Sequence, residues 1–159
     1  KNKHNQTRLN GQKQKTIIMA NKFLKFNISA LTGDAGLLAQ GPQLVNADDI
    51  SSVAYAAATG VLSIVLKGYA TTAPATATPL QSMSGRVVQI GCSKSPTAAG
   101  GANIPTITNG RQSPQKAVYA AMTANPGGVQ STVQLGVDNS ATPVQLYFTS
   151  FTITTAIIA

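Results

Sequence analysis

Acidic residues are scarce in this chain of 159 residues, and glutamate is absent altogether. The four acids are all aspartates, at Asp34, Asp48, Asp49 and Asp138. Catalysis by paired carboxylates, and metal sites built from several carboxylates, need more acidic residues than this. We therefore expect a protein that is not an enzyme and that holds no metal or organic cofactor.

The other residues that commonly carry chemistry are just as rare. The chain has one histidine, His4, one cysteine, Cys92, and no tryptophan. A Ser–His or Cys–His nucleophile would have to use His4, which lies in a polar terminal segment. A single cysteine forms neither an intrachain disulfide nor a thiolate metal cluster, so we expect Cys92 to be a small buried or half-buried thiol.

Long hydrophobic runs and phosphate-binding glycine patterns are missing as well. No window approaches the roughly 18 consecutive apolar residues of a membrane span. Neither G-x-G-x-x-G nor G-x-x-x-x-G-K-[ST] occurs in the sequence. We expect no membrane partner and no small-molecule substrate.

Positive charge is plentiful but unevenly placed. The formal net charge is +8, and seven of the 12 Lys and Arg residues fall within the first 25 residues, where there is no acid. We predict that residues 1–18 form a basic extended N-terminal arm and that residues 19–159 form a single β-rich domain. Five cations of the arm could contact phosphates or a neighbouring subunit: Lys1, Lys3, Arg8, Lys13 and Lys15. Equally, residues 1–18 could lie upstream of the true start, because Met19 resembles an ordinary translation start.

Apolar residues in the body mostly follow a two-residue period, which is typical of strands. We expect strands over residues 22–28, 50–57, 61–67, 86–92, 129–135 and 144–154, with turns at Gly33, Gly36, Gly41 and Pro42. One helix is expected over residues 114–124, because Ser113 is a suitable N-cap and Pro114 fits the first helical position. The sequence therefore predicts a mainly β fold, an antiparallel β-sandwich or barrel-like sheet with one short α-helix.

Two kinds of segment are candidates for contact with other molecules. The last strand has apolar residues on both faces, which is typical of a strand inside a sandwich or against another subunit. We take Tyr147, Phe151 and Ile153 as one such face and as candidate assembly residues. The long uncharged loops 70–84 and 93–112 are further candidate contact surfaces.

The pair Asp48–Asp49 admits two interpretations. Adjacent carboxylates can bind Ca²⁺, but such a site needs six or more oxygen ligands, and the neighbouring residues offer few. We favour a plain polar turn before a strand over a cation site.

Three segments carry a resemblance to a known class of proteins. They are the opening from Met19 to Phe26, the two-strand unit from Leu44 to Leu66, and the helix that runs into Ala124-Asn-Pro-Gly-Gly-Val and a Thr/Gln-alternating strand. In these segments and in its Ala/Thr/Ser/Gln/Val-rich composition, the chain resembles the small structural proteins of tailed bacteriophages, particularly of marine and cyanobacterial phages. The resemblance implies a virion component without catalysis, such as a capsid decoration or cement protein or a minor capsid subunit. Its partners would be copies of itself, the major capsid protein, or both.

Two other functions stay open at this point. The chain could be the subunit of an extracellular fibre or pilus-like filament that assembles by strand donation. It could also be a nucleic-acid-binding module that uses the basic arm, in which case binding would weaken steeply with salt.

Overall fold

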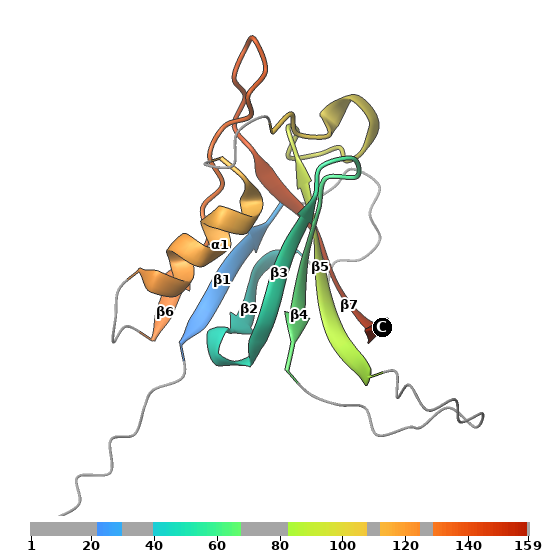
Figure 1. The fold of residues 1–159 in the computed structure, drawn as a ribbon. Coiled ribbons are helices and arrows are strands. Elements are labelled where there is room, and N and C mark those ends of the chain that lie inside the picture. Colours follow the sequence, from blue (N-terminus) through green and yellow to red (C-terminus); the bar gives the residue numbers. More distant parts are fainter. Residues whose placement is uncertain (1–21, 30–39, 68–82, 108–111, 125–128, 159) are drawn as a thin grey trace, which may run out of the picture.

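The computed structural model describes residues 22–29, 40–67, 83–107, 112–124 and 129–158, and of residues 83–85 and 155–158 it describes the backbone alone (Figure 1). The elements are β1 (Phe23–Ile28), β2 (Gly41–Asn46), β3 (Ile50–Ala56), β4 (Val61–Leu66), β5 (Met83–Ser93), α1 (Pro114–Thr123), β6 (Gln130–Thr132) and β7 (Tyr147–Ile158). Two short 3-10 turns, η2 (Ala47–Asp49) and η3 (Gly101–Asn103), complete the set. The mainly β fold with one short helix is confirmed.

The strands form one mixed sheet of seven strands. Its order is β2-β1-β7-β5-β4-β3, and β6 pairs with β1 beside this path. Most neighbours are antiparallel, but β1 runs parallel to both β6 and β7. The sheet does not close into a barrel.

The core lies between the β1 region and the β3–β4–β5 part of the sheet, with α1 packed beside it (Figure 1). On β1 the alternating residues Leu24, Phe26 and Ile28 are buried, as their spacing predicts. Phe26 meets Phe148 of β7 edge to face, with ring centroids 5.3 Å apart. This contact joins the two parts of the sheet at the place where β1 and β7 pair.

The predicted helix is confirmed within one residue at its end. Pro114 occupies its first turn, and Val118 and Ala121 face the core. Ser113 holds the N-cap position, although its side chain makes no capping hydrogen bond. At the other end the Lys22 ammonium donates hydrogen bonds to the carbonyls of Met122 and Ala124. A cation is favourable there because the last carbonyls of a helix carry partial negative charge.

The expectation of a turn at Gly41 and Pro42 is wrong, because both residues belong to β2. The Ala47 N–H donates to the Lys22 carbonyl over 2.7 Å. In an antiparallel strand, the backbone groups of every second residue face the same neighbour. The backbone of Ala47 faces β1, so those of Val45, Gln43 and Gly41 do as well, and that of Pro42 points to the outer edge of the sheet. The proline therefore costs β2 no hydrogen bond with β1.

Other strand boundaries differ from the expectation, among them those of β6 and β7. The strand predicted over residues 129–135 pairs with β1 only through Gln130–Thr132, after which the chain turns away, although Val133 stays buried. The last strand begins at Tyr147 rather than at Val144. The candidate loop 70–84 lies almost wholly outside the described residues, and the loop 93–112 contains η3.

Candidate interaction surfaces

Within the described ranges, no three His, Cys, Asp or Glu side chains gather as metal ligands would. Cys92 is buried, and burial raises the pKa of its thiol to about 12. It is therefore protonated at neutral pH and a poor nucleophile. None of the helices that the structure describes is long and apolar enough to cross a membrane.

The cationic candidates Lys1, Lys3, Arg8, Lys13 and Lys15 all lie outside the described residues. The structure does place the other three candidates, Tyr147, Phe151 and Ile153, in β7. Phe151 packs against the core, whereas 62% of Ile153 is exposed. Tyr147 is half-buried and lies near the start of the strand.

The expectation that these three share one face is wrong because β7 has an irregularity near its start. The pairing between β5 and β7 shifts between Gly91 and Cys92, so that Phe148 pairs with Cys92 while Ser150 pairs with Gly91. Thr149 is the extra residue, and such a bulge reverses the alternation of side chains beyond it. Phe148 and Phe151 therefore both face the core, and Tyr147 faces the other way.

Gly91 belongs to the same irregularity. A Cβ atom at this position would lie 2.6 Å from the Ser150 hydroxyl and 3.0 Å from the Thr149 hydroxyl. The Gly91 N–H also donates to the Ser150 Oγ over 3.0 Å. A side chain at position 91 would therefore displace at least the Ser150 hydroxyl from its place beside the bulge.

The outer face of the β3–β4–β5–β7 part of the sheet has no charged side chain among its described positions. The strand registers place twelve residues on this uncharged outer face: Ser52, Ala54, Ala56, Val61, Ser63, Val65, Val87, Gln89, Gly91, Ser150, Thr152 and Thr154. Of these, Val87 is only 7% exposed and is not available for contact. The opposite face carries the core residues Leu62, Ile64, Val88 and Ile90. In a sheet with one solvated face, each strand normally alternates polar residues that point outward with apolar residues that point inward. The outward residues normally include charged ones. Here the outward positions are small, and several are apolar.

Two hydroxyls on the uncharged outer face are already bonded within the sheet. The Thr152 Oγ1 donates to the Gln89 carbonyl over 3.3 Å, and the Thr154 Oγ1 donates to the Val87 carbonyl over 3.4 Å. Because these two hydroxyls have partners, covering them with another protein surface would leave neither unsatisfied.

Both outermost strands of the main path carry a feature that hinders pairing with another strand. On β2 this is Pro42, which lacks an N–H. On β3 it is the helix, because the Gln115 Nε2 donates to the Val53 carbonyl over 2.8 Å. The Tyr119 hydroxyl lies 3.5 Å from the same carbonyl. These features hinder strand addition at β2 and β3. Beyond Phe148, however, β7 pairs with β5 alone among the described strands, so its other edge is open.

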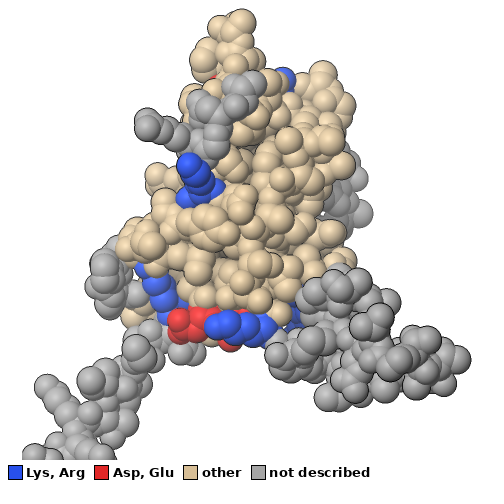
Figure 2. All heavy atoms as spheres, viewed as in Figure 1, with Lys and Arg blue, Asp and Glu red and all other residues tan. Residues whose placement is uncertain are grey.

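The charged side chains seen in Figure 2 gather mostly along the lower end of the molecule. Asp48 and Asp49 form η2 there, and the Lys67 ammonium donates to the Asp48 carbonyl over 2.8 Å. The Asn46 side chain accepts from the Asp48 N–H over 3.1 Å, so the pair forms a polar turn before β3, as expected.

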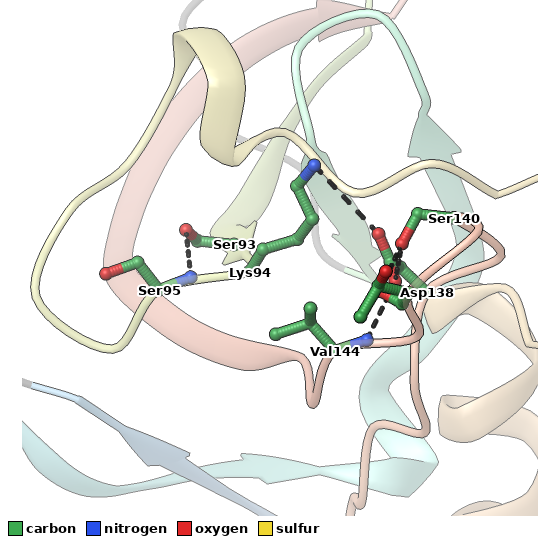
Figure 3. Close-up of polar contacts among 7 residues, drawn as sticks. Ser93, Lys94, Ser95, Asp138, Ser140 and Val144 are labelled. Carbon is green, nitrogen blue, oxygen red and sulfur yellow. Dashed lines mark hydrogen bonds and ion pairs between the residues drawn. The ribbon is translucent and has the colours of Figure 1, made fainter.

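The Asp138 carboxylate is buried, with the residue only 1% exposed. Its Oδ1 accepts hydrogen bonds from the Val144 N–H over 3.0 Å and from the Ser140 hydroxyl over 2.8 Å (Figure 3). Its Oδ2 lies 4.0 Å from the Lys94 ammonium, which comes from the segment after β5. These donors lower the pKa of Asp138, the Val144 N–H most of all, although burial opposes them.

The Asp138 contacts join two loops at one end of the fold. The Asn139 N–H adds a hydrogen bond to the Thr106 carbonyl over 2.7 Å. The sequence gives little indication of this arrangement, because no local pattern links Asp138 to Lys94, which lies 44 positions earlier.

Comparison of the chain with protein-family models, with curated proteins and with solved structures finds no match.

Proposed function

We propose that this chain is a non-enzymatic structural subunit of a virus particle, of the capsid decoration, cement or minor capsid type. In this role it associates with further copies of itself through the uncharged outer face. The resemblance of residues 19–135 to small structural proteins of tailed bacteriophages supports the viral part of the proposal. The major capsid protein is the second partner that such a role implies.

The uncharged outer face is the observation that carries the proposal. The whole chain has a net charge of +8, so two copies repel each other wherever their charged regions meet. On this face no like charges would be opposed. Small side chains such as Ala54, Ser63 and Thr152 also allow a second flat surface to approach closely.

A contact through this face is small, which favours an assembly held by many weak contacts. Strands about 4.8 Å apart and residues about 3.4 Å apart give a patch of about 300 Å² for four strands of five residues. A stable pairwise complex buries about 800 Å² on each partner. Repetition in a symmetric shell, together with the N-terminal arm, would supply the remaining binding energy.

Strand donation, the basis of the filament alternative, is hindered at two edges of the sheet but not at a third. It requires an open edge with a run of unpaired N–H and C=O groups. Pro42 interrupts the outer edge of β2, and Gln115 occupies a carbonyl of β3. The edge of β7 beyond Phe148 has no partner among the described strands, and it is the edge that a donated strand could use. The nucleic-acid alternative depends on the arm, whose residues lie outside the described ranges.

Charge substitution at Gln89, in the middle of the uncharged outer face, tests the proposal. Gln89→Glu and Gln89→Lys each place like charges opposite one another in a symmetric contact, so each variant alone should associate less than the parent chain. An equimolar mixture of the two should recover association, because opposite charges then meet. Chemical cross-linking of the full chain, followed by gel analysis, measures this.

The matched control is the same pair of substitutions at Gln130, an exposed residue of β6 outside this face. These variants should associate like the parent chain. The proposal fails if the Gln89 variants cross-link as well as the parent chain, or if mixing them restores nothing.

A further inference from the structure

The sheet forks beside β1. On one edge of β1 the pairing with β6 ends where the Val133 N–H donates to the Lys25 carbonyl over 2.9 Å. Pairing with β7 begins where the Ser29 N–H donates to the Phe148 carbonyl over 2.7 Å. Asn27 lies between these two points on the same edge, since alternate residues of a strand face the same side.

The N–H of Asn27 therefore faces the fork at a position where neither strand continues the hydrogen-bond ladder. Among the described strands, the pairing of β1 with β6 stops at Lys25↔Thr132. The pairing of β1 with β7 consists of Ile28↔Phe148 alone. A backbone donor in such a place needs an acceptor from water or from a ligand. This gives the fork one fixed hydrogen-bond donor.

A hollow of about 380 Å³ lies at the fork. Six of its lining side chains are polar and uncharged at neutral pH: Asn27, Ser29, Thr132, Gln134, Gln145 and Tyr147. The apolar part of the lining includes Val133, Leu146 and Phe148, all of them buried in the fold. Gln145 is held in place because its Nε2 donates to the Leu135 and Leu146 carbonyls over 3.0 and 3.1 Å.

The chemistry of this lining selects the class of ligand. No carboxylate, ammonium, guanidinium or imidazole belongs to it. A charged ligand would lose water there without gaining a counter-charge. Amides and hydroxyls both donate and accept, so they match a neutral molecule whose groups also do both. The half-buried Tyr147 ring and the apolar floor suit the C–H faces of a ring.

We propose that the fork between β1, β6 and β7 is a binding site for a neutral sugar residue, such as one hexose unit of a glycan. The hollow is within the size range of small-molecule sites. The Asn27 N–H donates to a sugar oxygen, and the hydroxyls of Thr132 and Tyr147 bond further hydroxyls. This site does not depend on the proposed assembly role, because it lies outside the uncharged outer face.

The test is titration of the ¹⁵N-labelled full chain with glucose, galactose, mannose and N-acetylglucosamine, monitored by amide chemical shifts. At least one sugar should shift the Asn27 amide saturably in the millimolar range, with the other changes confined to the fork. Thr132→Val and Tyr147→Phe should each weaken that sugar about fivefold, the effect of one lost hydrogen bond. Thr106→Val, the same change at an exposed loop position, should leave binding unchanged.

Several results would overturn the site. The first is the absence of a saturable shift at Asn27 with all four sugars. The second is binding that neither Thr132→Val nor Tyr147→Phe weakens; if one variant does not fold, the other decides alone. The third is a shift at Asn27 produced by a peptide of residues 12–21 and not by the sugars, which would assign the fork to an added strand. The Gln89 variants leave all these readouts unchanged, so failure here is distinct from failure of the proposed function.

Discussion

Asp138 is one of the residues through which two loops contact each other. Its carboxylate is buried and accepts from Val144 and Ser140 while facing Lys94. Because its pKa is lowered in the folded state, its contribution to stability is present above the unfolded pKa of about 3.9. That contribution is lost as the pH falls through the lower, folded pKa.

We therefore predict that acid loosens this end of the fold and that Asp138→Asn removes part of the acid dependence. The variant should be less stable than the parent chain at pH 7, where Lys94 loses its counter-charge, and should differ less from it at low pH. Urea unfolding as a function of pH measures both effects. Asp48→Asn, at an exposed carboxylate of η2, is the control and should leave the profile almost unchanged.

Gly91 provides a second prediction at the residue scale. Gly91→Ala places a methyl group 2.6 Å from the Ser150 hydroxyl, so it should lower the free energy of unfolding by about 1–3 kcal/mol. Gly136→Ala is the matched control, because nothing lies within 4 Å of the added atom. Thermal unfolding of the two variants decides the matter. Equal stability of both would show that the bulge tolerates a side chain at position 91.

At the scale of elements, α1 protects the edge of β3. Replacing Gln115 by Leu and Tyr119 by Phe removes the groups that lie against the Val53 carbonyl. We expect this double variant to lose about 1–2 kcal/mol of stability and to aggregate through the exposed edge. Thioflavin fluorescence during incubation reports the aggregation. Lys116→Ala, on an exposed position of the same helix, should behave like the parent chain.

The elements that local patterns define could be predicted from the sequence. Leu24, Phe26 and Ile28 have the period of a half-buried strand, and Pro114 marks the start of the helix. In contrast, β2 was not predicted, because Gly41 and Pro42 are typical of turns unless the edge that they occupy is known. The bulge at Thr149 depends on the register between β5 and β7, which no local pattern contains.

The candidate sites divide in the same way. Ile153 is exposed, whereas Phe151 is partly buried and packs against the core. The uncharged outer face becomes visible only when four strands are placed side by side, because each contributes a few Ser, Thr, Ala or Val residues. The fork is likewise a product of pairing, since Asn27 and Gln145 are far apart in the sequence.

At the scale of the whole molecule, most of the described charged side chains lie apart from the uncharged outer face. The described charges gather mostly at the lower end, and seven cations precede residue 26. This separation favours an oriented contact, with the uncharged outer face against a neighbour. We infer that this face and the basic arm both contribute to association and that neither alone is enough for a stable shell contact.

The most direct test is the mass of the chain in solution, measured by light scattering over a range of concentrations. Residues 1–159 and 19–159 should be compared side by side, with Gln89→Lys in the full chain as the third sample. The account predicts that the full chain forms species whose masses are multiples of 16.3 kDa, and that both altered chains form fewer of them. A full chain that stays a monomer at every concentration would contradict association between copies.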